Sequence, residues 1–149
     1  MPRIISIIFI CLAFTLNNTN YIKPADVFDD YDGVLHVHTN IATNIPYTQV
    51  IPNGKAFILS TSLEHIDILF DNINYSNIKG YTVFLKTTDL QSVLNKLGLQ
   101  YFKNNNNEIL AYSSLVPFSL DLDGEIYNIQ IVKKSSQIVI GFPVILGSY

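Results

Sequence analysis

The sequence predicts an α+β fold, with two helices packed on one face of a mixed, largely antiparallel sheet that ends in a C-terminal β-hairpin or meander. Residues 55–86 contain a strand, a helix and a second strand joined by short turns. A second helical pattern follows at 88–97, and beyond residue 108 only short strand patterns remain. Helices and strands grouped in this way predict one α+β domain over residues 21–149.

The segment 55–86 is the best-defined unit of the chain. A short apolar strand at 56–59 follows a Pro-Asn-Gly turn, and Thr61 with Glu64 has the spacing of a capping box that begins a helix. The helix has one apolar face, formed by Leu63, Ile66, Leu69, Phe70 and Ile73. Aromatic and β-branched residues at 81–85 then favour a strand.

The second half of the domain is predicted to be mainly strands. Thr88 and Asp89 begin a helix with an apolar stripe, and Gly98 ends it. The expected strands are 99–103, 109–113, 118–122, 126–133 and 138–140. Asp123-Gly124 predicts a hairpin turn, since glycine tolerates the positive φ that such a turn needs, and Ser135-Ser136 offers a second turn.

Residues 1–20 have the character of a targeting segment. Arg3 and the amino terminus precede a mostly apolar run at 4–16, which is shorter than the roughly 20 residues that span a bilayer. A cleaved signal peptide, an uncleaved N-terminal anchor and a buried helix all fit this pattern. The single cysteine, Cys11, lies inside the segment, so a mature chain has no disulfide framework. We expect a secreted or envelope protein outside the cytoplasm.

The charge pattern argues against a nucleic-acid partner. The chain has a formal net charge of −3, and its lysines are scattered along the sequence rather than clustered. Binding to phosphates requires a basic face. We therefore expect an unknown protein or envelope component as the partner, with a possible membrane tether through residues 1–20.

His36 and His38 are the candidate metal ligands. Alternate residues of a strand point to the same face, so the two imidazoles can reach one metal ion. The phrase Leu-His-Val-His-Thr at 35–39 also resembles the first metal-binding motif of the polymerase and histidinol phosphatase superfamily. Val34 stands where that superfamily has an aspartate, and His65 is the only further histidine. The alternative interpretation is two polar residues on the exposed face of an amphipathic strand.

Two acidic groups have simpler structural interpretations. Residues 26–33 match part of an EF-hand loop, but Phe28 and Thr39 occupy its first and last ligand positions, which favours an acidic surface loop. Asp121, Asp123 and Glu125 flank the predicted hairpin turn, where carboxylates are commonly solvated. The sequence contains no nucleophile elbow and no phosphate-binding glycine loop.

Five segments form a further pattern: residues 115–119, the Asp-Gly at 123–124, residues 128–131 and 138–145, and the strand and capped helix at 80–98. Together they resemble the YwmB family of uncharacterised secreted proteins of spore-forming Gram-positive bacteria. The resemblance implies an exported bacterial α+β protein. It assigns no catalytic residue and no cofactor.

The sequence leads to two functional hypotheses. The first is an exported, non-enzymatic binding or interaction domain of the bacterial cell envelope, in which some of the nine tyrosines form contact surfaces. The second is a metal-binding protein or metal-dependent hydrolase that uses His36 and His38. Whether the chain is an enzyme is left open by the sequence, and no cofactor is indicated.

Overall fold

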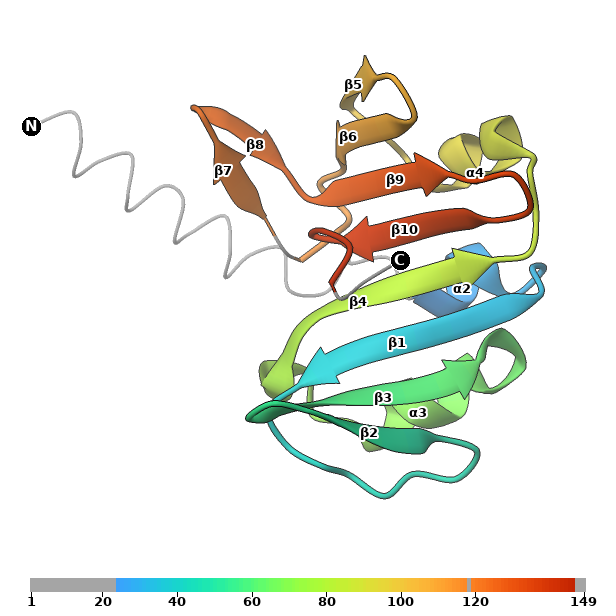
Figure 1. Cartoon of the computed structure of the whole chain (residues 1–149), viewed down its shortest axis with the longest axis vertical. Coiled ribbons are helices and arrows are strands. Elements are labelled where there is room, and N and C mark those ends of the chain that lie inside the picture. The colour runs from blue at the N-terminus through green and yellow to red at the C-terminus, as the bar shows by residue number, and fades with distance from the viewer. Residues whose placement is uncertain (1–23, 118, 147–149) are drawn as a thin grey trace, which may run out of the picture.

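Eight antiparallel strands form one sheet in the computed structural model, which describes residues 24–117 and 119–146 (Figure 1). The strand order is β2-β3-β1-β4-β10-β9-β6-β5, and β7 and β8 form a separate two-stranded hairpin. The strands are β1 (Gly33–Thr39), β2 (Gln49–Asn53), β3 (Ala56–Ser62), β4 (Ile78–Leu85), β5 (Tyr101–Asn105), β6 (Glu108–Tyr112), β7 (Leu120–Leu122), β8 (Glu125–Tyr127), β9 (Ile129–Lys133) and β10 (Ile138–Phe142). The predicted targeting segment 1–20 lies outside the described residues.

In the described residues, three α-helices accompany the sheet. They are α2 (Pro24–Phe28), α3 (Ile66–Asn72) and α4 (Leu90–Lys96), with two short 3-10 turns, η1 (Leu63–His65) and η2 (Tyr75–Asn77). In Figure 1 the three helices lie behind the sheet. The predicted α+β class with a largely antiparallel sheet and C-terminal strands is confirmed, although α2 was not expected. In the part of the chain that the structure describes, no helix is long and apolar enough to cross a membrane.

One hydrophobic cluster joins the helices to the sheet. It contains the inward residues of β1, β4, β9 and β10, such as Leu35, Val83 and Ile131, together with Leu69 of α3 and Val93 of α4. Each of these five side chains is at most 1% exposed. Burial of a large aliphatic side chain contributes about 1.5–3 kcal/mol, so this cluster is the main source of stability.

The predicted strand-helix-strand unit exists, but its two strands are not neighbours. β3 and β4 both pair antiparallel with β1, which lies between them. β1, which precedes the strand-helix-strand unit in the sequence, therefore lies between the two strands of that unit. The predicted apolar face is confirmed, because Leu63, Ile66, Leu69, Phe70 and Ile73 are all buried.

The predicted capping box was wrong. Thr61 belongs to β3, and its Oγ1 donates a hydrogen bond to the carbonyl of Tyr47 (3.0 Å) instead of capping a helix. The strand continues to Ser62, and the chain enters α3 through η1 without a side-chain cap at either start. The strand extends beyond the predicted 56–59 because each added residue gains a partner on the sheet: Ser60 pairs with both β1 and β2, and Thr61 and Ser62 pair with β1.

The acidic segment 26–33 is only partly a surface loop. Phe28 ends α2, is 1% exposed and packs edge-on against Phe142 with ring centroids 6.1 Å apart. The acidic residues that follow are exposed, and Asp30 pairs with Lys96 at 2.9 Å. The apolar residue at the first position of the partial EF-hand match is therefore a core residue.

The predicted strand 126–133 is split into β8 and β9 at Asn128. This side chain is 1% exposed; its Oδ1 accepts from the amide of Ser113 (2.9 Å), and its Nδ2 donates to the carbonyls of Ser113 (2.7 Å) and Val116 (3.4 Å). The amide of Asn128 donates to the carbonyl of Ala111 (3.0 Å). Asn128 thus forms hydrogen bonds with backbone groups of the loop that follows β6. These bonds interrupt the strand, and β8 pairs with β7 in the hairpin instead of continuing the main sheet.

Candidate binding groove

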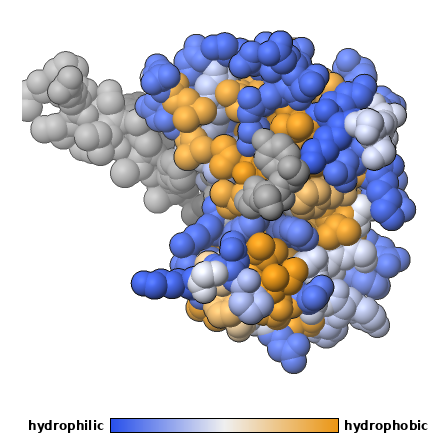
Figure 2. All heavy atoms as spheres, viewed as in Figure 1, coloured by the Kyte–Doolittle hydropathy of each residue, from blue (hydrophilic) through white to orange (hydrophobic). Residues whose placement is uncertain are grey.

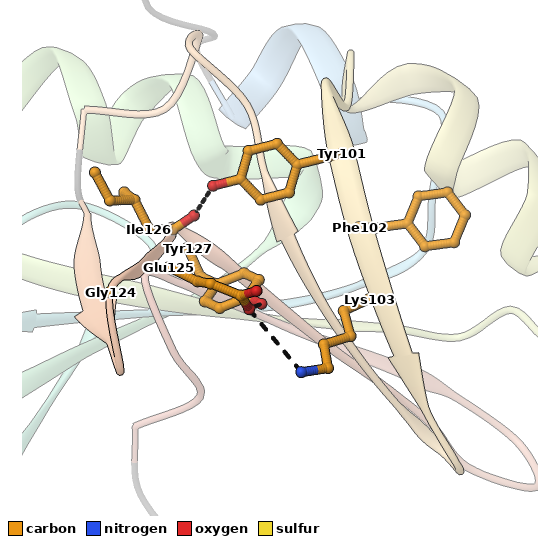
Figure 3. Close-up of a pocket in the computed structure, with 7 residues that line it drawn as sticks. All are labelled: Tyr101, Phe102, Lys103, Gly124, Glu125, Ile126 and Tyr127. Atoms are coloured by element: carbon orange, nitrogen blue, oxygen red, sulfur yellow. Dashed lines mark hydrogen bonds and ion pairs between the residues drawn. The ribbon is translucent and has the colours of Figure 1, made fainter.

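A groove of about 640 Å³ lies between strand β5 and the β7–β8 hairpin. Its lining residues are Tyr101, Phe102 and Lys103 of β5 with Gly124, Glu125, Ile126 and Tyr127 of the hairpin (Figure 3). The hairpin turn itself is the predicted one, because Asp123 and Gly124 have φ values of 55° and 84°. This turn geometry is the one that two-residue hairpins favour.

Aromatic rings form the inner part of the groove. The ring of Tyr101 stacks on Tyr112 with centroids 5.4 Å apart and meets Tyr127 edge-on at 6.1 Å. The Tyr101 hydroxyl donates to the carbonyl of Ile126. Figure 3 shows Tyr101 reaching toward the hairpin, whereas Phe102 points to the opposite side of β5. The tyrosines therefore hold the hairpin against the sheet, and the ring of Tyr101 stays partly exposed at the groove.

One carboxylate lies among these rings. The Tyr127 hydroxyl donates to Glu125, and this bond, with burial and the negative charge of Glu125, raises the pKa of Tyr127 to about 12. Burial and the nearby Tyr112 and Glu125 also raise the pKa of Tyr101. Lys103 Nζ lies 3.9 Å from Glu125, and both side chains are mostly exposed. The groove thus combines aromatic surface with a negative charge.

Exposed apolar side chains gather around the same place. Of the seven large hydrophobic residues that are exposed in the described chain, four lie on β5 or the hairpin: Tyr101, Phe102, Leu122 and Ile126. Figure 2 shows hydrophobic surface over the hairpin, at the upper left of the view. Such clustering is more informative than scattered exposed residues, which are normal on monomers.

Strand β5 is also an open sheet edge. It pairs with β6 on one side, and no described strand pairs with its other side. All five of its residues are exposed. An edge strand of this kind leaves backbone N–H and C=O groups free to pair with another chain.

His36 and His38 lie on the same face of β1, as predicted from the strand period. In the sheet, His36 lies opposite Ser60 and Thr82, and His38 opposite Ile58 and Gly80. Burial lowers the pKa of both imidazoles, and the charge of His36 lowers the pKa of His38 further.

The two histidines have different surroundings. The ring of His36 packs edge-on against Phe84, with centroids 4.9 Å apart. His38 is 7% exposed, and its Nε2 has no hydrogen-bond partner. Within residues 24–117 and 119–146 there is no group of three or more His, Cys, Asp or Glu side chains arranged for a metal. A metal at this place would therefore need water or an exogenous ligand to complete its coordination.

The acidic turn residues have local partners. Asp121 Oδ1 accepts a hydrogen bond from the amide of Gly124 (2.8 Å), which stabilises the hairpin turn. Asp123 occupies the left-handed turn position, and Glu125 lines the groove. Sequence reasoning assigned these three to a solvated turn and missed the groove. The available signal was the alternation of aliphatic and acidic residues on both sides of the Asp-Gly turn, together with the adjacent aromatic residues Tyr101 and Phe102.

The chain matches no protein-family model, no curated protein and no solved structure. The fold and the groove define its class instead: a small α+β domain whose described residues form an antiparallel sheet with an aromatic groove beside its edge strand β5.

Proposed function

We propose that the chain is a non-enzymatic interaction domain that binds a polypeptide partner through the groove between β5 and the hairpin. The observation that carries this function is the coincidence of an unpaired edge strand with four of the exposed large hydrophobic side chains. Aromatic residues are enriched at protein interfaces because they bury a large area and their polar groups tolerate water. A free edge adds main-chain hydrogen bonds to such a contact.

The apolar contacts alone give only weak binding. Tyr101, Phe102, Leu122 and Ile126 are about half exposed, so complete burial of each would contribute roughly 1 kcal/mol. Association costs about 4–15 kcal/mol in lost freedom and ordering. Main-chain pairing at β5 and charge interactions in the groove must therefore supply much of the affinity.

The proposed location is the bacterial cell envelope or the outside of the cell. Residues 1–20 would export the domain or tether it, as their apolar core suggests, and the resemblance to the YwmB family implies an exported protein. In the exported domain, helices α3 and α4 would cover one face of the sheet, and the edge strand β5 would remain accessible to a partner.

Affinity capture from an envelope extract tests this function. The full chain should retain a discrete partner, and the double substitution Phe102→Ser/Ile126→Ser should lose it. Ile41→Ser is the matched control, since Ile41 is 50% exposed and does not line the groove. The double substitution removes one exposed apolar side chain from β5 and one from the hairpin. Equal capture by this double variant, or a monomeric chain that retains nothing, would contradict the proposed function.

A second candidate function is metal binding by His36 and His38. It is favoured by the buried Nε2 of His38, which has no hydrogen-bond partner, because buried polar atoms are normally satisfied. The lowered pKa values keep both imidazoles in the neutral form that binds metals. Zinc and manganese are the ions to test first, with zinc the better match to imidazole ligands.

Thermal unfolding of the metal-stripped chain distinguishes the two functions. A metal that binds only the native state raises the unfolding midpoint. A rise with zinc or manganese that disappears in His36→Ala/His38→Ala would establish the histidine pair as a site. An unchanged midpoint in the parent chain would remove this candidate.

A further inference from the structure

The charge around the groove is negative on its hairpin side. Among the described lining residues Glu125 is the one carboxylate and Lys103 the one cation, and the exposed residues Asp121 and Asp123 add two carboxylates to the same hairpin outside the lining. Asp121 is engaged by the turn amide of Gly124. Glu125 therefore presents the main negative charge to an incoming group.

Lys103 neutralises Glu125 only weakly. Their closest N–O distance is 3.9 Å, and the two side chains are 67% and 59% exposed. Exposed ion pairs with this separation contribute about 0–1 kcal/mol because solvent screens them and both side chains must be ordered. A second cation can displace Lys103 from this carboxylate at little cost.

The rings beside Glu125 favour the same kind of ligand. Tyr101 and Tyr127 meet edge-on at an interplanar angle of 69°, and because Tyr127 is 5% exposed and Tyr101 is 45% exposed, the ring accessible to a ligand is that of Tyr101. A cation over a tyrosine face gains about 0.5–1 kcal/mol at exposed sites. Aromatic rings next to a carboxylate thus select a positive side chain over a neutral or negative one.

The open edge of β5 provides the backbone that would carry this side chain. Tyr101 and Lys103 are alternate residues of β5, and both line the groove. A strand added beside β5 would place its own alternate side chains about 4.5–5.5 Å from these two. From that position a lysine or arginine side chain is long enough to reach Glu125.

We propose that the partner segment is an extended, basic polypeptide strand that pairs with the outer edge of β5 and places a lysine or arginine side chain against Glu125 and the ring of Tyr101. This assignment rests on the proposed function of the groove and names the chemistry of its ligand. Affinity is then divided between main-chain hydrogen bonds along β5 and one cation-specific contact at Glu125.

Short fluorescent peptides test both contacts on the full chain. The first probe is the pentapeptide Thr-Val-Lys-Val-Thr with blocked termini. Two control peptides have norleucine or glutamate in place of lysine. Anisotropy titrations at low salt should give at least tenfold tighter binding for the lysine probe than for the glutamate probe. The difference should shrink in concentrated salt, because screening weakens exposed charge contacts.

Protein variants and a backbone-modified probe separate the two contributions. Glu125→Gln should reduce the preference for lysine, Lys103→Gln should strengthen binding of the lysine probe, and Glu64→Gln, an exposed carboxylate outside the groove, should change neither. Alternate amides of a strand point to opposite edges, so N-methylation of one set or of the other gives two versions of the lysine probe (the two frames). Only the version methylated on the edge that pairs with β5 should lose binding.

Three results would overturn the assignment. They are equal affinity for the lysine and glutamate probes, binding that survives N-methylation in both frames, and pairing of two copies of the chain through β5 in sedimentation experiments. If none of the peptides binds while the Phe102→Ser/Ile126→Ser variant still loses its captured partner, the ligand assignment fails and the proposed function stands. If no peptide binds and the double variant also captures the partner as well as the parent chain does, both the ligand assignment and the proposed function are rejected.

Discussion

The two outer strands of the sheet are protected to very different degrees. β2 packs Val50 against the hydrophobic core and carries Pro52, which has no backbone N–H to offer to another chain. Strand β5 has no proline, and its five residues are all exposed. Natural proteins usually protect sheet edges with proline, charge or coverage; β2 has a proline and a core contact, whereas the charge of Lys103 is the one such device in β5.

The exposed edge of β5 lies next to a second structural element, which forms a wall beside the strand. The β7–β8 hairpin stands beside β5 and is joined to it by the bond from Tyr101 to the carbonyl of Ile126. An open edge without such a wall is mainly an aggregation risk. With the wall, the edge becomes one side of a groove that can select its ligand.

Removing the hydrogen bonds that position the hairpin should have the largest effect. Asn128→Leu leaves the amide and carbonyl of Ser113 buried without their partner, and each unsatisfied group costs about 1–3 kcal/mol. We expect a loss of roughly 2–4 kcal/mol in the free energy of unfolding, measured by urea denaturation. The control Asn107→Ala, an exposed asparagine, should leave stability unchanged. A small loss for Asn128→Leu would show that the hairpin is positioned by other contacts.

Equivalent truncations at the two edges should differ in their effect on stability. Val50→Ala in β2 removes partly buried methyl groups that pack on the core, and we expect it to cost about 1 kcal/mol. Phe102→Ala in β5 should change stability by less than about 0.5 kcal/mol, as for most exposed positions. Denaturant unfolding of both variants checks this difference, and equal losses would contradict the contrast between the edges.

The hairpin turns next to the two edges should respond differently to glycine and alanine. Gly54, between β2 and β3, has a φ of 62°, and a Cβ there would meet no atom within 4 Å. Gly54→Ala should therefore cost about 1 kcal/mol from backbone strain alone. Asn106, between β5 and β6, has a φ of 58°, so Asn106→Gly should be nearly neutral or slightly stabilising. Thermal unfolding measures both, and a stabilising Gly54→Ala would disprove the strain argument.

At neutral pH, removing one groove hydroxyl should have the smallest effect, but it should change the response to alkali. The bond to Glu125 raises the pKa of Tyr127 to about 12, above the usual value near 10 for a tyrosine. The folded state thus keeps this proton longer than the unfolded state does. The resulting stability is fully present below about pH 10 and is lost as the pH rises toward 12.

Tyr127→Phe isolates this contribution. Its stability should fall less steeply between about pH 10 and pH 12 than that of the parent chain. Absorbance titration of the phenolates should show one fewer late-titrating tyrosine. If the parent and the variant have the same alkaline stability profile, Tyr127 does not donate to Glu125 in solution.

Much of the fold was predictable from local patterns. The apolar face around Leu69, the Asp123-Gly124 turn and the helix after Asp89 are each encoded within a few residues. Asp89 indeed caps α4 by accepting from the amide of Ser92 (3.1 Å), and Gly98 ends it with a φ of 59°. Side-chain period, turn chemistry and caps act over one or two turns of chain, so a single sequence contains them.

Other features depend on partners far away in the sequence. Thr61 has the spacing of a helix cap, but its pairing with Leu35 of β1 and its hydrogen bond to the carbonyl of Tyr47 keep it in a strand. Asn128 lies in an apolar alternation, yet its bonds to Ser113 and Val116 break the strand. In both cases tertiary hydrogen bonds outweigh a local preference that is worth only about 1 kcal/mol.

The sequence by itself determined the α+β class, the hydrophobic faces, the hairpin turns and the shared face of His36 and His38, because these follow from short-range periodicity and backbone preferences. Only the tertiary structure decided that β1 lies between β3 and β4, that β5 is an open edge, and that the hairpin stands beside it. The groove joins residues 101–103 to residues 124–127 through long-range packing, which no local pattern specifies.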